Sequence, residues 1–331
     1  MIIHIGILTA PHIEALPSVH DGVPTTILRD VRIGIGFHWD RHEEQEFEGS
    51  MAIRHNTDGS ETAINTIDLE DYLTCVVSSE MRADSPLELL RAHAIIARSW
   101  ALRNLGKHAE LGYDLCADDC CQRYEGIRRR TERAIAAVRS TAGLVLTYDG
   151  QICDCRYSKC CGGRTEIPST CWDDLPDLPY LTSVECPWCD AQADPRREAV
   201  LLSVLNDYDL ETRDFHSWVA RYDNPEVIDL RPLRRGPSGR IAQLEVVYRD
   251  RTLRVGRELA IRRFLSPTCL KSSAFSVERQ SEGHFLLRGR GWGHGVGLCQ
   301  IGAALWAADG ATYKEILNHY YPGSTLKPLN F

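Results

Sequence analysis

Apolar residues recur at helical spacing in the segment "DLEDYLTCVVSS". Asp68 precedes the first of them and is a suitable N-cap, because its carboxylate can accept from the free amides of a first turn. The pattern therefore predicts a helix that begins after Asp68. Its apolar face comprises Leu69, Tyr72, Leu73, Val76 and Val77.

A second helix is predicted directly afterwards, in "SPLELLRAHAIIARSWALRN". Ser85 is predicted to cap it, with Pro86 at the first position and Glu88 completing a capping box. Alanine dominates the apolar face, so we expect this helix to lie close against a neighbour. That face comprises Leu87, Leu90, Ala94, Ala97 and Ala101.

Strand and helix patterns alternate along the rest of the chain. "VRIGIGF" alternates with period two and predicts a strand, and the acidic run "RHEEQEFEG" after it predicts a solvated turn. Asp149-Gly150 predicts a hairpin in "GLVLTYDGQICDCRY", and "IAQLEVVYRDRTLRV" predicts another. Short helices are predicted over 196–206 and 258–265, in "LCQIGAALWAADG" with Gly310 after its end, and in "TYKEILNHYYPG" with a Thr312–Glu315 capping box.

Helices and β-hairpins are mixed without βαβ regularity, which predicts an α+β fold. We expect residues 1–66 to form a β-rich segment that packs on a main domain over 67–331. That domain would contain a cysteine-rich region over 116–189 and an insertion around 190–285. We expect a catalytic cleft between the predicted helical pair and the β and loop elements.

Composition excludes some classes of function. The net charge is −8 and the basic residues are scattered, which argues against nucleic-acid binding. No run of 18 apolar residues is present, so we predict no transmembrane segment. The apolar start "MIIHIGILTAPHIEAL" lacks a basic region and does not resemble a signal peptide, which leaves a cytoplasmic protein or a removed leader as alternatives.

One carboxylate stands at the junction of the two predicted helices. Glu80 follows the first helix and lies four residues before Asp84, among apolar neighbours that would raise its pKa toward the value a general acid needs. A solvated helix-terminal glutamate is the alternative. Arg98 lies on the flank of the second helix and could reach a carboxylate or a substrate, or remain a surface arginine.

Cysteines are concentrated in one region: ten of the 13 lie between Cys116 and Cys189. His108, Cys116 and Cys120 or Cys121 provide soft ligands within fourteen residues, a spacing that suits zinc in a loop. Three protein ligands would leave one position open for water or substrate. A disulfide or unreactive thiols are the alternatives.

Two further motifs carry candidate chemistry. "CDCRYSKCCGGRTE" and "CPWC" favour a second metal site or a structural disulfide over a redox pair, because no thioredoxin-like setting surrounds them. "GRGWGHGVGLCQIGA" places glycines around Trp292 and His294, which suits either a sugar-facing wall or a tight core turn. Gly162 and Gly163 indicate positive φ or a close backbone approach.

Several of these motifs together resemble the SpoIID/LytB family, the group of stage II sporulation protein D and the amidase enhancers. The resemblance runs in order from about Leu69 to Gly323. The motifs are "LEDYLTCVVSSEM…LLRAHAIIARSWAL", "CQRYEG", "GLVLTYDGQ", "YSKCCGGRTE", "PYLTSV" and "GRGWGHGVGLCQIGA".

This resemblance implies a SpoIID-like fold and a lytic transglycosylase that cleaves peptidoglycan glycan strands, preferably peptide-free, to 1,6-anhydro products. Its catalytic glutamate corresponds to Glu80, with Arg98 and Tyr180 in support. One zinc ion is implied, held by His108, Cys116 and Cys120 or Cys121. Candidate substrate-binding residues are Trp292, His294, Gln300, Gly162 and Gly163.

The family also keeps other functions open. A wall-binding regulator that enhances a separate cell-wall amidase is one alternative, and a zinc or redox module based on the cysteines alone is another. Glycan strands, and an amidase in the first alternative, are the expected partners. The resemblance implies a location in the cell envelope or outside the cell.

Overall fold

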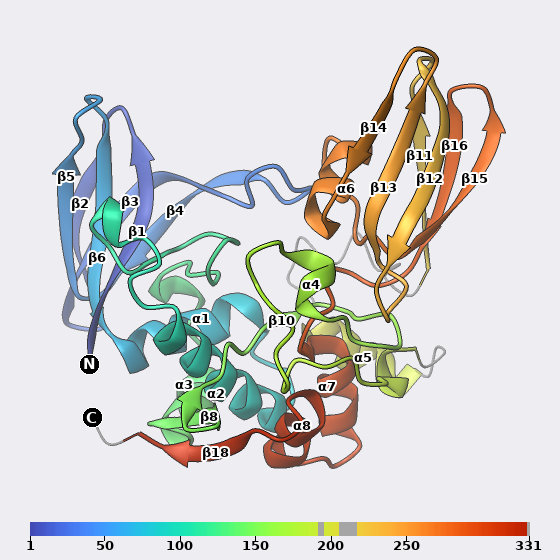
Figure 1. Cartoon of the computed structure of the whole chain (residues 1–331). Coiled ribbons are helices and arrows are strands. Elements are labelled where there is room, and N and C mark those ends of the chain that lie inside the picture. The colour runs from blue at the N-terminus through green and yellow to red at the C-terminus, as the bar shows by residue number, and fades with distance from the viewer. Residues whose placement is uncertain (191–194, 205–216, 330–331) are drawn as a thin grey trace.

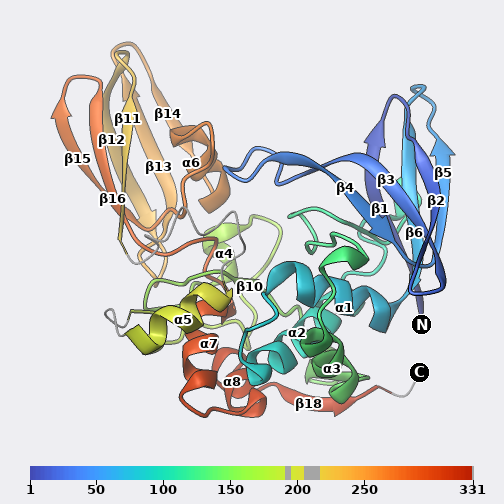
Figure 2. The same ribbon diagram turned by 180° about the vertical axis from the view of Figure 1, so that it is seen from behind.

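The computed structural model describes residues 1–190, 195–204 and 217–329. A helical core forms the base, and two β lobes rise from it on opposite sides (Figures 1 and 2). The combination of helices with several small sheets confirms the predicted α+β class. Within the described ranges, no helix is long and apolar enough to cross a membrane.

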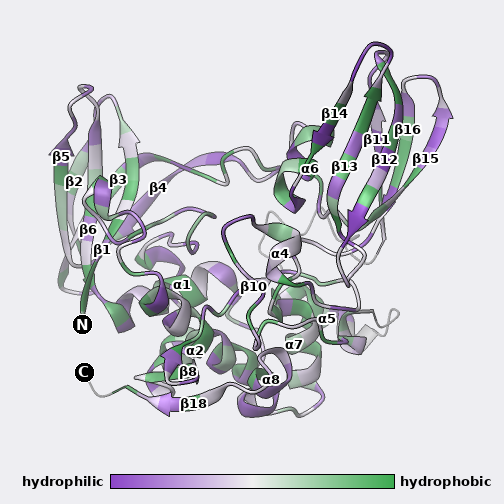
Figure 3. Ribbon diagram, viewed as in Figure 1, coloured by the Kyte–Doolittle hydropathy of each residue, from purple (hydrophilic) through white to green (hydrophobic). Residues whose placement is uncertain are grey.

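The helices of the core carry many apolar residues (Figure 3), and these are buried together in one cluster. The Asp68 cap is confirmed, since its side chain accepts from the amide of Glu70. The Thr312–Glu315 capping box and the position of Gly310 after a helix are also confirmed. The core helices are α1 (Leu69–Glu80), α2 (Leu87–Arg103), α3 (Glu132–Ser140), α7 (Gln300–Ala308) and α8 (Tyr313–Tyr320).

The predicted cap of α2 is wrong. Pro86 occupies the N-cap position without a side-chain bond, and the Ser85 hydroxyl donates instead to the carbonyl of Ser203, 2.6 Å away. Glu88 accepts from Arg91 and from the amide of Tyr313. Tertiary contacts therefore replace the local capping box. The alanine-rich face of α2 is buried as predicted.

The N-terminal lobe consists of two sheets, in the orders β5-β6-β1-β7 and β2-β3-β4. Their strands are β1 (Ile2–Ala10), β2 (Ala15–His20), β3 (Val23–Ile33), β4 (Arg41–Phe47), β5 (Ser50–His55), β6 (Glu61–Asp68) and β7 (Leu115–Cys116). The acidic run predicted as a turn is strand β4, because Glu46 accepts from Thr25 and pairs with Arg128. Ion pairing of this kind lets a strongly charged segment lie in a sheet.

The segment between β3 and β4 crosses from the N-terminal lobe toward α6 (Glu258–Leu265) in the other lobe (Figure 1). The sequence pattern predicts a strand over residues 31–37, but β3 ends at Ile33. Gly34 and Gly36 adopt positive φ angles, which interrupt the extended backbone. Phe37 and Trp39 stack with ring centroids 4.5 Å apart, and Arg263 of α6 lies 5.5 Å from the Phe37 ring. We call residues 34–40 the arm.

Short helices and strands complete the core and its surroundings, among them a three-stranded sheet in the order β18-β8-β9. The Asp149-Gly150 hairpin is confirmed, although its second strand has two residues. These elements are η1 (Ala109–Leu111), η2 (Ile127–Arg129), β8 (Leu144–Tyr148), β9 (Gln151–Ile152), β10 (Tyr157–Ser158), α4 (Pro168–Cys171), η3 (Pro187–Asp190), α5 (Pro195–Val204), β17 (Leu298–Cys299) and β18 (Thr325–Pro328). The predicted helix over 196–206 corresponds to α5, and its last two positions lie outside the described residues.

The second lobe contains two three-stranded sheets and a hydrophobic core separate from that of the rest. The predicted hairpin in "IAQLEVVYRDRTLRV" and the helix over 258–265 are both confirmed. The strands are β11 (Trp218–Asp223), β12 (Val227–Arg235), β13 (Ile241–Tyr248), β14 (Thr252–Val255), β15 (Phe275–Ser281) and β16 (His284–Gly289).

Candidate active site

Glu80 is the last residue of α1, and its side chain is held by groups from two distant segments. The Tyr157 hydroxyl donates to one carboxylate oxygen and the side-chain amide of Gln300 donates to the other, each across 3.3 Å. Glu80 is partly exposed. The arrangement therefore orients a carboxylate while leaving part of it accessible.

Parallel pairing of two short strands brings these donors together. Tyr157 in β10 lies opposite Leu298 in β17, so Gln300, the first residue of α7, lies beside the end of β10. His93 of α2 completes the group, with its Nε2 atom 3.4 Å from the Gln300 amide nitrogen. Its ring packs edge-on against Tyr157 at 4.5 Å.

The pKa of Glu80 results from opposing effects. Burial alone would raise it, but the positive charges of Arg123 and Lys159 and the hydrogen bond from Gln300 lower the pKa below its ordinary value. The raised pKa predicted from the apolar flanks of Glu80 is therefore wrong. The cationic groups lie far from Glu80 in sequence, so local context did not indicate them.

His93 is electrically neutral at neutral pH. Burial, followed by the charge of Lys159, lowers the pKa of His93 to about 4, although the charge of Glu80 acts in the opposite direction. Because the amide nitrogen of Gln300 can only donate, Nε2 of His93 is the acceptor in their contact. The side-chain amide of Gln300 therefore donates to both His93 and Glu80, and His93 fixes its orientation toward the carboxylate.

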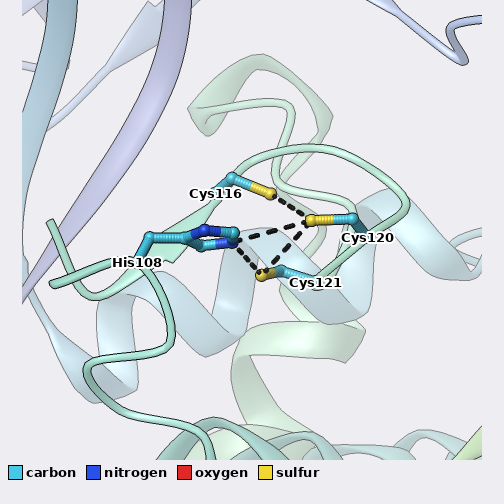
Figure 4. A group of neighbouring side chains, drawn as sticks. All are labelled: His108, Cys116, Cys120 and Cys121. Carbon is cyan, nitrogen blue, oxygen red and sulfur yellow. Dashed lines mark hydrogen bonds between the residues drawn. The ribbon is translucent and has the colours of Figure 1, made fainter. Parts of the chain in front are cut away.

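A second group of side chains lies in the loop that follows α2 (Figure 4). His108, Cys116, Cys120 and Cys121 place their ligand atoms within 4.8 Å of one another. The sulfurs of Cys116 and Cys120 are 3.1 Å apart, and Nε2 of His108 lies 3.4 Å from Cys121 and 3.6 Å from Cys120. Three thiols and an imidazole are a donor set that suits a tetrahedral zinc ion.

This group differs from the expected three-ligand site. Both Cys120 and Cys121 lie close enough to join His108 and Cys116. Four protein donors fill a tetrahedron, which is the arrangement of a structural site with no open position. The donor set therefore fits a metal ion that stabilises the loop and does not itself contact a substrate.

The segment after these cysteines connects the zinc-type group to Glu80. The amide of Glu125 donates to the hydroxyl of Ser79, the residue before Glu80. Arg123 is the strongest of the charges that lower the pKa of Glu80 and lies 5.5 Å from the ring of Trp39 in the arm. The loop that the cysteines would fix is thus the loop that brings Arg123 to the carboxylate.

The structure does not bring Arg98 to Glu80. The buried Arg98 guanidinium donates to both carboxylate oxygens of Glu70, at 2.8 and 2.6 Å, and to the carbonyl of Leu144. Glu70 and Glu80 are ten residues apart on α1, about 15 Å along a helix axis. Arg98 therefore joins α2 to the opposite end of α1 and to β8.

Tyr180 is also placed away from Glu80 by its contacts. Its hydroxyl accepts from the backbone amide of Asp154, and its ring packs against Tyr148 at 5.6 Å. Asp154 in turn pairs with Arg156, the residue before Tyr157. Tyr180 supports the segment that leads into β10 rather than contacting the carboxylate itself.

The glycine-rich loop around Trp292 surrounds a buried arginine. Arg240 donates to the carbonyls of Gly293, Cys160 and Cys161, and a Cβ at Gly295 would lie 2.5 Å from its guanidinium carbon. This close approach explains why glycine is required there. The loop therefore forms a core turn, the alternative to a sugar-facing wall.

Trp292 and His294 lie within this packing. Trp292 is 4% exposed and contacts the rings of His38 and Trp39, so its face is covered by the arm. Nδ1 of His294 accepts from the amide of Val296, and burial with nearby arginine charges lowers the pKa of His294 to about 3. Trp39 is partly exposed and is the ring of this group that lies beside Arg123.

Gly162 and Gly163 both adopt positive φ. The amide of Gly163 donates to the sulfur of Cys189 at 3.1 Å, and a Cβ at Gly162 would approach Gly291. The pair therefore serves a close backbone approach within a cysteine cluster. Of the predicted substrate-binding residues, Gln300 is the one that contacts Glu80.

Sequence inspection missed Tyr157, His93, Arg123 and Lys159 as parts of this site. Tyr157 and Lys159 belong to the motif "YSKCCGGRTE", and Arg123 belongs to "CQRYEG". Both motifs thus contain polar residues of the site beside their cysteines. His93 lies on the largely apolar helix α2, where a buried histidine is an unusual residue.

Two cavities border the described elements. One of about 320 Å³ lies at the corner after Glu80 and is lined by Ser78, Met81, Arg82, Ala83, Asp84, Arg129 and Thr131. The other, of about 380 Å³, lies between α4 and the second lobe and is lined in part by Asp173 and Arg257.

Comparisons with known proteins agree with the family resemblance. The sequence model of the family "Stage II sporulation protein" (SpoIID) matches residues 57–148, and that of a domain of unknown function (DUF8618) matches residues 221–297. An uncharacterized protein of Brachyspira hyodysenteriae is 31% identical over 286 residues, which are 86% of this chain and 73% of that protein.

Two relatives from Bacillus subtilis carry names. Its stage II sporulation protein D is 27% identical over 280 residues, 80% of this chain and 76% of the relative. Its amidase enhancer is 24% identical over 291 residues, 76% of this chain but 39% of that longer protein. The similarity thus extends beyond the segment that the family model matches.

Proposed function

Because the chain belongs to the SpoIID/LytB family, we propose that it is a peptidoglycan lytic transglycosylase with Glu80 as its catalytic acid and base. The substrate would be glycan strands, preferably without stem peptides, and the products would end in a 1,6-anhydro ring. The cell envelope is the corresponding location.

A single carboxylate is sufficient for this chemistry. Ordinary glycosidases use two, one as an acid and one as a nucleophile or base. In the lytic reaction, Glu80 donates a proton to the bridging oxygen as the glycosidic bond breaks. The sugar's own 6-hydroxyl then attacks the anomeric carbon and returns its proton to Glu80. No water is consumed, and the carboxyl group ends in its starting state.

The observation that carries the proposal is the fixed geometry of Glu80. Tyr157 and Gln300 each contact one of its oxygens, and His93 orients Gln300 from a buried position. Two donors, one on each oxygen, fix the direction in which the carboxylate points. A helix-terminal glutamate in open solvent would have no such partners.

The other family-derived residues support the site from a distance. We propose that Arg98 fixes α1 on α2 through Glu70, and that Tyr180 fixes the segment before β10 through Asp154. Both act as positioning residues, since neither contacts Glu80. Trp39 of the arm is the ring best placed to stack on a sugar, because it is partly exposed and lies over Arg123.

Zinc enters the proposal as a structural ion. His108, Cys116, Cys120 and Cys121 would hold it, and it would supply a rigid anchor for the loop that carries Arg123. The thiolates and the imidazole would fill its coordination sphere. Proton transfer is assigned to Glu80 alone.

The test is the Glu80→Gln variant, incubated with peptide-free glycan strands. We expect loss of at least about a hundredfold in the release of anhydro-ended fragments, which are one water lighter than hydrolysis products by mass spectrometry. Glu132→Gln is the matched control, because Glu132 is an exposed glutamate in the first turn of α3. Parent-like release by Glu80→Gln would refute the assignment.

A regulator that enhances a cell-wall amidase is the second candidate. The lowered pKa of Glu80 favours it, because a carboxylate without a proton is a poor acid at neutral pH. The amidase enhancer of Bacillus subtilis is a relative consistent with this role. A pure enhancer would release no anhydro ends from glycan strands at any pH, yet would increase the rate of an added amidase.

A further inference from the structure

A second cysteine cluster lies inside the molecule, apart from the zinc-type group at His108. Cys161, Cys186, Cys189 and Cys299 place all four sulfurs within 4.8 Å of one another. None is more than 1% exposed. They come from the loop after β10, from η3 and the residue before it, and from the last position of β17.

Backbone amides point at these sulfurs. The amide of Gly163 donates to Cys189 at 3.1 Å, and those of Cys161 and Gly302 each donate to Cys299 at 3.3 Å. The Tyr320 hydroxyl lies 3.1 Å from the sulfur of Cys186. Such donors stabilise thiolates, because four thiolates around a divalent cation carry two excess negative charges.

We propose that these four cysteines bind a single zinc ion, or another ion of the same charge and preference for thiolates, in a closed structural site. A tetrahedral zinc ion with Zn–S bonds of about 2.3 Å separates its sulfurs by about 3.8 Å. Cys161 and Cys189 lie 3.4 Å apart, in the range of that spacing. An iron–sulfur cluster would hold the sulfurs farther apart, because several irons lie between them.

Disulfides explain the geometry less well. A disulfide would draw two sulfurs to about 2 Å and leave no reason for all four to share one centre. The amide donors also favour thiolates, since a disulfide sulfur is a weak acceptor without charge. The CxxC spacing of Cys186 and Cys189 is the usual spacing for two ligands of one structural zinc ion.

The ion would tie together the two segments that hold Glu80. Cys299 immediately precedes Gln300, and Cys161 follows β10, which contains Tyr157. Both Gln300 and Tyr157 donate to the Glu80 carboxylate. This consequence for catalysis rests on the proposed function, whereas binding of the ion does not.

The first test measures metal content in the purified full-length chain. Elemental analysis and native mass spectrometry should find two zinc ions in the parent protein and one in Cys186→Ser. Cys171→Ser is the matched control, since Cys171 is a buried cysteine of the same region outside both clusters, and it should retain two. Unchanged zinc content in Cys186→Ser would overturn the proposal.

The second test keeps the protein unaltered, in case Cys186→Ser does not fold. Cadmium substituted for zinc should give two resonances, because cadmium shifts move downfield with each added thiolate ligand. The more downfield resonance would report the site with four sulfur ligands. The second resonance would report the site with three sulfur ligands and one histidine. A single cadmium resonance would overturn the proposal. Bound iron with visible charge-transfer bands would also overturn it, as would a metal-free chain whose mass is lower by the two hydrogens lost in a disulfide.

Catalysis is measured separately, so the two proposals fail separately. Loss of the second zinc should lower the release of anhydro ends, because Gln300 and Tyr157 are no longer fixed. If Glu80→Gln is as active as the parent while the metal counts are as expected, the enzyme mechanism is wrong and the zinc site stands.

Discussion

The side-chain amide of Gln300 donates to the carboxylate of Glu80 across 3.3 Å, although 220 residues separate them in the chain. The contact exists because β10 pairs in parallel with β17, which leads directly into α7. The chain thus closes its helical core by bringing the start of α7 back to the end of α1. The position of one carboxylate depends on that closure.

Replacing Gln300 by leucine should impair catalysis without unfolding the core. A hydrogen bond to a charged group contributes about 1.5 kcal/mol or more, so we expect at least about a tenfold loss in kcat/KM for anhydro-end release. Circular dichroism and the melting temperature should remain near those of the parent. Gln151→Ala, at an exposed position in the β8–β9 hairpin, serves as control. Equal activity of Gln300→Leu and the parent would show that the contact is incidental.

The pH dependence of activity should reflect the lowered pKa of Glu80. A general acid works when protonated, so kcat/KM should fall tenfold per pH unit once the pH exceeds that lowered pKa. Arg123→Gln removes the strongest charge that lowers it, while burial remains. The falling limb should therefore move to higher pH.

Arg103→Gln, at an exposed arginine near the end of α2, controls for a general change in net charge. The measurement is the rate of anhydro-end release between pH 3 and 8 at low substrate concentration. A limb that stays in place in Arg123→Gln, or moves to lower pH, would contradict the electrostatic origin of the lowered pKa.

Sequence patterns predicted the elements whose stability is local. The Asp68 cap, the Thr312–Glu315 capping box and the Asp149-Gly150 hairpin form as expected because each is decided by a few neighbouring residues. Ser85 shows the limit of this reasoning. Its hydroxyl binds the carbonyl of Ser203, a partner 118 residues away that no local pattern contains.

The candidate site shows the same division. Glu80 and the cysteine-rich loop were identified from motifs, but the partners that set the properties of Glu80 were not. Tyr157 and Lys159 reach it through strand pairing, and Arg123 through a loop fixed elsewhere. Trp292 is covered because the arm crosses between the lobes and places Trp39 against it. The spacing of apolar residues along the sequence does not indicate such a crossing.

Removing the metal from the group at His108 should loosen the loop over residues 120–125. The Tyr124 amide donates to Ala117 and the Glu125 amide to Ser79, so both should be protected from hydrogen exchange in the metal-bound protein. Cys121→Ser should increase their exchange while the amides of α8 remain protected. Cys75→Ser is a buried-cysteine control outside the group. Unchanged exchange after metal loss would remove the structural role of the ion.

Breaking the Glu70–Arg98 pair should reduce stability more than activity. Glu70→Ala leaves the buried guanidinium without its carboxylate, and loss of one partner of such a pair costs about 3 kcal/mol. Urea unfolding measures this loss. Among molecules that remain folded, kcat should stay within about threefold of the parent, since Arg98 acts through α1. A hundredfold fall in kcat with unchanged stability would instead place Arg98 in the chemistry.

Acid should destabilise the fold through two histidines that are neutral in the native state. The pKa of His93 is lowered to about 4 by burial and Lys159, and that of His294 to about 3 by burial and Arg156, Arg240 and Arg262, from an ordinary value of 6.5. The unfolded chain binds these protons first, so the free energy of unfolding is highest above pH 6.5 and declines as the pH falls toward 4. The decline should reach roughly 3 kcal/mol per histidine.

His294→Gln should flatten this dependence in urea unfolding at pH 7 and 5, whereas His12→Gln, at a side chain that is 81% exposed, should not. Equal slopes for His294→Gln and the parent would show that His294 is not the group that titrates.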